Sequence, residues 1–94
     1  MRPEFAPYTL EIRRNVEKQF DKLSDQDVLR IVEALDRLAL LGMGDIKDIG
    51  EDYPGRYRFR VGSWRVYFNL DGQVIDVVAI EKRGEAYKKR SRNR

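Results

Sequence analysis

The spacing of hydrophobic positions changes several times along the first half of the chain. From Tyr8 to Ile12 apolar and polar residues alternate, which is typical of a strand. From about Asn15 the apolar residues recur every three or four positions, which predicts a short helix. A second helix is expected to begin after Ser24, a hydroxyl N-cap with an acid three residues later, and to end at Gly42. Because the turn between them is tight, we expect the two helices to form an antiparallel hairpin.

The second half of the chain alternates with a period of two, which predicts strands. An acidic connector, residues 45–55, precedes them. Gly62-Ser63 suits a type II′ turn and Asp71-Gly72 a type I′ turn, so three strands are expected to follow one another as hairpins. The sequence therefore predicts an α+β fold: an N-terminal strand, the helical hairpin, and a three-stranded antiparallel β-meander with the helices packed on one face.

Two-residue turns also predict which side chains share a face of the sheet. The apolar face, expected to receive the helices, contains Tyr57, Phe59, Val61, Trp64, Val66, Phe68, Ile75, Val77 and Ala79. The opposite face is expected to carry Arg56, Arg58, Arg60, Arg65, Tyr67, Asn69, Val74, Asp76, Val78 and Ile80. Like charges directly opposite each other, as Arg60 and Arg65 would be, are unfavourable in a sheet. The cluster therefore indicates an anion-binding face, the alternative being arginines that only solvate the sheet.

Composition limits the class of protein. Ninety-four residues suit one domain, expected over residues 6–94, with residues 1–5 disordered or vector-derived and residues 88–94 a basic tail. Residues 82–94 carry a net charge of +6 and residues 1–81 a net charge of −3, which favours a polyanionic or acidic partner at one surface. The chain has no cysteine and no histidine, and no apolar run of the about 18 residues that span a membrane. We expect a cytoplasmic protein without cofactor, metal or membrane association.

Two motifs resemble the RelE/ParE toxin superfamily of toxin–antitoxin modules. YRFRVGSWRVYF, residues 57–68, is similar to the family pattern Y-R-x-R-x-G-x-[YW]-R, and RGEAY, residues 83–87, is similar to its basic residue followed by tyrosine. The likeness runs from about Tyr8 to Lys89. The RelE branch implies an endonuclease that cleaves messenger RNA in the ribosomal A site, needs no metal and is silenced by a cognate antitoxin.

The resemblance also implies roles for individual residues. The catalytic residues would be Arg65, Arg83, Arg58, Tyr87 and Arg56. Contacts to messenger RNA and to ribosomal RNA phosphates would come from Arg60, Tyr67, Lys82, Lys88 and Lys89. For Tyr67 two roles remain open, packing filler and a platform on which a base stacks. The antitoxin is expected to cover apolar residues such as Val78 and Ile80.

The general base is the part of this site that the sequence does not assign. Cleaving RNA through its 2′-hydroxyl needs a base at that oxygen, and positive charge where the phosphorane develops. Arginine supplies the charge but does not lose its proton, and this chain has Arg56 and Arg58 where the family has lysines. Glu81 is the nearest candidate base and Glu85 the alternative. The missing lysines also favour an alternative function, non-enzymatic inhibition of DNA gyrase as in ParE-like toxins. The third possibility is a plain RNA-binding module.

Overall fold

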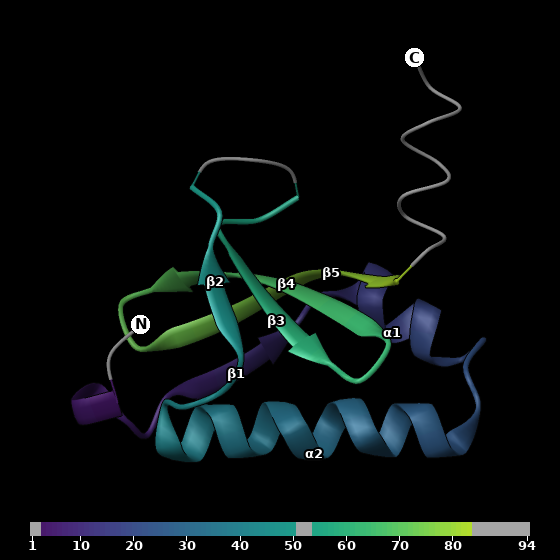
Figure 1. The fold of residues 1–94 in the computed structure, drawn as a ribbon, viewed down its shortest axis with the longest axis horizontal. Helices are drawn as coiled ribbons and strands as arrows, with labels where there is room; N and C mark the ends of the chain where they lie inside the picture. Colours follow the sequence, from purple (N-terminus) through teal and green to yellow (C-terminus); the bar gives the residue numbers. More distant parts are fainter. Residues whose placement is uncertain (1–2, 51–53, 84–94) are drawn as a thin grey trace.

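The computed structural model describes residues 3–50 and 54–83 of the chain (Figure 1). A five-stranded sheet lies over the long helix, and a short helix stands at one end of the sheet. The elements are η1 (Pro3–Phe5), β1 (Thr9–Ile12), α1 (Arg14–Phe20), α2 (Asp25–Leu41), β2 (Ile46–Asp48), β3 (Tyr57–Val61), β4 (Trp64–Asp71) and β5 (Val74–Lys82). The α+β class is therefore as predicted.

The sheet has more strands than the predicted three-stranded meander. β3, β4 and β5 pair antiparallel in sequence, as expected, but the full order is β1-β5-β4-β3-β2. β1 pairs parallel with β5, and β2, which forms within the acidic connector, pairs antiparallel with β3. The predicted strand number is wrong because part of the connector pairs with β3: Ile46 packs against the core, while Lys47 and Asp48 are exposed.

α2 begins and ends as its sequence predicts. The Ser24 hydroxyl oxygen accepts a hydrogen bond from the backbone N–H of Asp27 (3.1 Å), which satisfies one of the free donors of the first turn. Gly42 ends the helix in the left-handed conformation, with φ 68°, and its N–H donates to the Leu38 carbonyl (2.7 Å).

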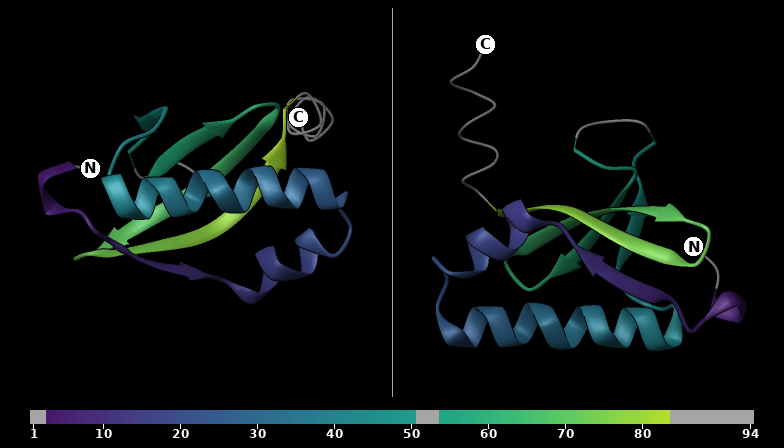
Figure 2. Two further views of the ribbon diagram at one scale, coloured as in Figure 1. Left: turned by 90° about the horizontal axis from the view of Figure 1, so that it is seen from below. Right: turned by 180° about the vertical axis from the view of Figure 1, so that it is seen from behind.

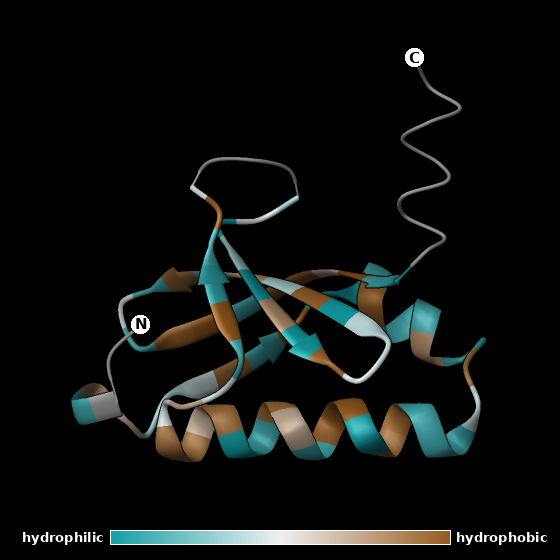
Figure 3. Cartoon of the chain, viewed as in Figure 1, coloured by the Kyte–Doolittle hydropathy of each residue, from teal (hydrophilic) through white to brown (hydrophobic). Residues whose placement is uncertain are grey.

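The core lies between α2 and the inner face of the sheet. α2 contributes Ile31, Leu35 and Leu38, which are fully buried, and Figure 3 shows apolar residues recurring along this helix. α1 adds the buried Val16. α1 packs chiefly against β5, and in the views of Figure 2 it is inclined to α2, to which a short turn joins it.

A β-bulge in β5 changes which residues face the core. Tyr67 lies opposite Ala79, but Phe68 lies opposite Val77, so Val78 has no partner on β4. The alternation predicted from Val74 to Ile80 therefore reverses after the bulge. Ile80 is 2% exposed and belongs to the core, whereas Ala79 lies on the opposite face. The predicted faces of both residues are wrong.

The backbone carbonyls at the outer edge of β5 accept hydrogen bonds beyond the point where β1 ends. β1 pairs with Val74–Val77, and the side-chain amides of Asn15 and Gln19 then donate to the carbonyls of Val78 (3.0 Å) and Ile80 (3.3 Å). α1 thus continues the hydrogen bonding where the parallel strand stops.

The apolar surface predicted to bind the antitoxin is covered by other parts of the protein. A Cβ on Gly55 would lie 3.0 Å from Val78 Cγ2, so the connector backbone lies directly against the Val78 side chain. Ile80 is in the core. The expectation that these two residues form an exposed docking surface is wrong because the bulge and the connector cover them.

The N-terminal residues differ from the expectation of a disordered segment. Pro3–Phe5 form a 3-10 turn, and the Phe5 carbonyl accepts a hydrogen bond from Gln73 Nε2 (2.7 Å). The Tyr8 N–H donates to the Ala39 carbonyl (2.6 Å), which ties this segment to the end of α2.

Replacing Gly44 with alanine is expected to lower the free energy of unfolding by about 1–3 kcal/mol, the usual effect of overpacking. A Cβ at this position would lie 2.7 Å from Phe59 Cε1, and the Phe59 ring is buried and cannot move away freely. Urea denaturation measures the effect. The control is Met43→Ala at the exposed neighbouring position, expected to change stability by less than about 0.5 kcal/mol. Equal stability of the two variants would contradict the packing of Gly44 on Phe59.

Candidate nucleic-acid interface

Basic side chains gather on the face of the sheet opposite α2. Two rows of directly opposed residues cross it: Lys47–Arg58–Tyr67–Ala79 over β2 to β5, and Arg60–Arg65–Glu81 over β3 to β5. The first hairpin has the predicted register, with Arg60 opposite Arg65. We define the arginine face as Lys47, Arg56, Arg58, Arg60, Arg65, Tyr67 and Glu81.

Two of the four arginines have carboxylate partners. Arg56 Nη2 lies 3.4 Å from Asp48 Oδ2, and Arg60 Nε lies 3.8 Å from Asp45 Oδ2. These side chains are exposed, and such surface pairs contribute only about 0–1 kcal/mol, so both arginines can exchange the carboxylate for another anion. The pKa of Asp48 is lowered, first by the hydrogen bond from the Gly50 N–H and then by Arg56.

Arg58 and Arg65 are the half-buried arginines of this face. Within residues 3–50 and 54–83, neither has a carboxylate within ion-pair distance. Arg65 interacts instead with the Tyr67 hydroxyl. Two arginines at diagonal positions of neighbouring strands, without ion-pair partners in this part of the chain, are suited to bind a phosphate.

Tyr67 and Glu81 form the polar contact at the centre of the arginine face. The Tyr67 hydroxyl donates a hydrogen bond to Glu81 Oε2 (3.1 Å). The pKa of Tyr67 is raised, first by burial and then by the charge of Glu81, with Arg65 opposing, so the phenol stays protonated and donates. Tyr67 is 1% exposed, which leaves no ring face for a nucleobase. The predicted stacking role is therefore wrong, and packing is the role that the structure supports.

Asp76, the one acid predicted on the same face, does not join the arginines of β3 and β4. Its two carboxylate oxygens accept hydrogen bonds from Arg13 Nε (3.2 Å) and Nη2 (2.9 Å). This contact raises the pKa of Arg13. As expected, Asp76 is a structural partner of an arginine, and it ties the end of β1 to β5.

Two of the predicted basic residues lie at the end of β5 and just after it. Arg83 lies beside the first hairpin, because its N–H donates to the Ser63 carbonyl (2.7 Å). Lys82, the last residue of β5, lies opposite Trp64, an inner-face residue, and so on the other side of the sheet from the arginine face. Tyr87, Lys88, Lys89 and the alternative base Glu85 lie outside the described residues.

Sequence reasoning missed one residue of this face and two carboxylates that pair with its arginines. Lys47 lies opposite Arg58, and Asp45 and Asp48 are the carboxylates that pair with Arg60 and Arg56. The short run Ile46-Lys47-Asp48-Ile49 has no period of two that would have indicated a strand within the acidic connector. Arg13 follows β1, and nothing in the sequence around it indicated that it would pair with Asp76.

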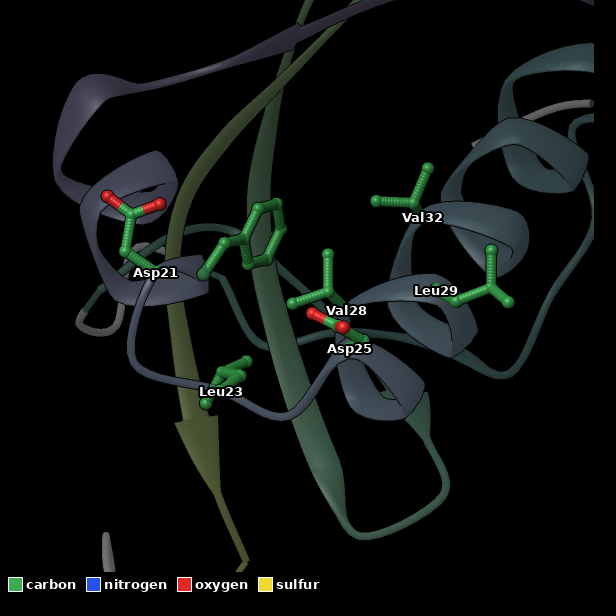
Figure 4. Close-up of a pocket in the computed structure, with 7 residues that line it drawn as sticks. Asp21, Leu23, Asp25, Val28, Leu29 and Val32 are labelled. Carbon is green, nitrogen blue, oxygen red and sulfur yellow. The ribbon is translucent and has the colours of Figure 1, made fainter.

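A second surface feature is a hollow of about 560 Å³ between α1 and the first turns of α2 (Figure 4). Its lining is mostly apolar and comes from Phe20, Leu23, Val28, Leu29 and Val32, with Asp21 and Asp25 beside them. Leu29 is 57% exposed at the edge of this apolar lining. We call this hollow the helix groove.

No group of three metal-ligating side chains occurs among the described residues. None of the helices in the part of the chain that the structure describes has the length and apolar character to cross a membrane.

Comparison with known proteins gives one family. A family model described as the ParE toxin of type II toxin–antitoxin systems, parDE, matches residues 4–87. The match includes every strand of the sheet, both helices and the whole arginine face. No curated protein sequence matches the chain.

Proposed function

The chain belongs to the ParE toxin family of type II toxin–antitoxin systems, and we propose that it cleaves messenger RNA in the ribosomal A site without metal, as does the RelE branch that residues 57–68 resemble. The arginine face carries this proposal. Arg58 and Arg65 lie on neighbouring strands, and Arg65 lies opposite the carboxylate residue Glu81. Neither arginine has a carboxylate within ion-pair distance among the described residues. A bound RNA phosphate would replace the missing partner.

The chemistry of strand cleavage needs groups of this kind. When the 2′-oxygen of RNA attacks the neighbouring phosphorus, negative charge develops on the phosphorane oxygens. Fixed guanidinium groups stabilise such charge, and they do so best where burial lowers the dielectric constant around them. Arg56 and Arg60 supply further positive charge at the rim of the face, where it strengthens phosphate binding without taking part in the reaction.

The proposal is tested with purified protein and ribosomes programmed with a defined codon in the A site. The expected result is a cut within that codon, seen by mapping the 3′ ends of the message. Binding should also weaken steeply with salt, by about 0.7–0.9 in log–log slope for each phosphate contacted. An intact message at excess protein would overturn the proposal.

Inhibition of DNA gyrase is the second candidate function, and the absence of lysine from β3 favours it. The outward positions of this strand are arginines, which cannot act as bases at neutral pH. A gyrase supercoiling assay separates the two candidates. We expect the supercoiling rate to stay unchanged at micromolar protein; its loss, together with an intact message, would establish the second function.

A cognate antitoxin is the partner that the family implies. We propose that a segment of the antitoxin binds in the helix groove, since the surface around Val78 and Ile80 is covered by the protein itself. The groove has the shape and apolar lining that suit one face of an amphipathic helix. Asp21 and Asp25 lie beside it, so basic residues flanking that apolar face would add complementary charge.

Replacing Leu29 with arginine is expected to weaken antitoxin binding by about 30-fold or more, the effect of losing an interface anchor worth about 2 kcal/mol. Leu29 is largely exposed, so the fold should not change. Calorimetric titration with the antitoxin encoded beside the toxin measures the affinity. The control is Leu40→Arg, at an exposed position of the same helix outside the groove. Equal affinities of both variants would show that the antitoxin binds elsewhere.

A further inference from the structure

The bulge at Val78 determines which face of the sheet Glu81 occupies. With unbroken alternation Glu81 would share the inner face with Ile75 and Val77. The extra residue moves it to the outer face, directly opposite Arg65, and gives the core position to Ile80. Bulges commonly redirect a side chain next to an active site. Here the redirected side chain is a carboxylate, and it arrives at the centre of the arginine face.

Tyr67 holds this carboxylate in place. The residue opposite Tyr67 is Ala79, whose methyl group leaves room for the phenol to reach diagonally to Glu81 Oε2 (3.1 Å). The ring is buried, so packing fixes the position of its hydroxyl group. With Oε2 accepting this hydrogen bond, Oε1 is the oxygen that can accept a proton.

Three other carboxylates that the structure describes near this face are engaged by arginines. Asp45 and Asp48 lie against Arg60 and Arg56, and Asp76 is bound by Arg13. Glu81 instead is held by a neutral phenol and lies across the strand pair from Arg65. Among the described residues, no guanidinium group lies within ion-pair distance of the Glu81 carboxylate. A phosphate bound to Arg65 would therefore lie beside a carboxylate that is not neutralised by an ion pair in this part of the chain.

Resting on the ribonuclease function proposed above, we infer that Glu81 is the general base and Tyr67 its positioning residue. Glu81 Oε1 takes the proton of the ribose 2′-hydroxyl. The 2′-oxygen forms a bond to the adjacent phosphorus, and the bond from phosphorus to the 5′-oxygen breaks. The products are a 2′,3′-cyclic phosphate and a 5′-hydroxyl whose proton comes from water, and Glu81 then returns its proton to water. Arg65 stabilises the charge on the phosphorane.

The test is single-turnover cleavage of a synthetic message on programmed ribosomes by the full chain. Glu81→Gln keeps the shape of the side chain and an oxygen for Tyr67, but it is no base. We expect the cleavage rate to fall by about 100-fold or more, the usual effect of removing a general base, with ribosome binding unchanged. The matched control is Glu11→Gln, on β1 of the same face opposite Asp76, which should cleave at the wild-type rate.

A double-mutant cycle separates positioning by Tyr67 from a purely structural role. Tyr67→Phe should slow cleavage in the wild-type background without weakening ribosome binding. In the Glu81→Gln background it should cause no further loss of rate, because the carboxylate that it positions is gone. Equal losses in both backgrounds would mean that Tyr67 acts only through the fold. Circular dichroism and thermal unfolding establish that each variant is folded.

The outcomes distinguish this inference from the function on which it rests. If Glu81→Gln cleaves at the wild-type rate while Arg65→Ala does not, the inference is overturned and the ribonuclease function stands. If Lys47→Met abolishes cleavage and Glu81→Gln does not, the base lies on β2 and the inference is again overturned. If the wild-type protein leaves the message intact, both are overturned.

Discussion

Replacing Arg65 with alanine is expected to reduce message cleavage by about 100-fold or more and to abolish growth inhibition. Removing one preorganised group that stabilises developing negative charge typically has an effect of this size. Arg65 is half-buried, next to Tyr67 and Glu81, so water cannot fully replace its guanidinium group. Single-turnover cleavage on programmed ribosomes gives the rate, and growth after induction without antitoxin gives the effect in cells.

The control for this variant is Arg37→Ala, which removes the same charge from the exposed surface of α2. It should cleave at the wild-type rate, because the net charge of the protein is not what acts on the phosphate. The Arg65 variant should keep the wild-type circular dichroism spectrum, since its side chain lies outside the core. Full cleavage by folded Arg65→Ala protein would show that the arginine face is not the catalytic surface.

Replacing Phe68 with alanine is expected to lower the free energy of unfolding by about 3–5 kcal/mol. The Phe68 ring is fully buried and stacks on Tyr57, with ring centroids 5.2 Å apart. Domains of this size are stable by about 5–15 kcal/mol, so the variant would lose a large part of its stability. Urea denaturation followed by circular dichroism measures the loss.

The matched control for Phe68 is Leu40→Ala, at a position 65% exposed on α2. It should change the free energy of unfolding by less than about 0.5 kcal/mol. The comparison tests whether Phe68 lies on the inner face of the sheet, opposite to the face of its neighbour Tyr67, as the register of the hairpins requires. A small effect of Phe68→Ala would mean that the register deduced for the hairpins is wrong.

Local patterns predicted much of this fold because they act over a few residues. Ser24 and Gly42 mark the ends of α2 through hydrogen bonds and a backbone conformation that depend only on neighbours in the chain. The turn at Gly62-Ser63 fixes the register of β3 and β4, so Arg58 and Arg65 could be assigned to the outer face correctly.

The features that the sequence did not predict depend on contacts between distant segments. The bulge at Val78 arises between β4 and β5, and no single residue type there marks it. As a result Ala79 and Ile80 were assigned to the wrong faces of the sheet. The pairing of β1 with β5 and of Arg13 with Asp76 joins residues about sixty positions apart in the chain, which periodicity cannot reveal.

The proposed ribonuclease would cleave RNA at its arginine face through the 2′-hydroxyl of the RNA itself. A test uses two messages on programmed ribosomes, one all-ribose and one with a single 2′-deoxynucleotide on the 5′ side of the cleaved bond. We expect the all-ribose message to be cut to a 2′,3′-cyclic phosphate and the deoxy-substituted message to stay intact at that bond. Cleavage of both messages, or of neither, would contradict the proposal.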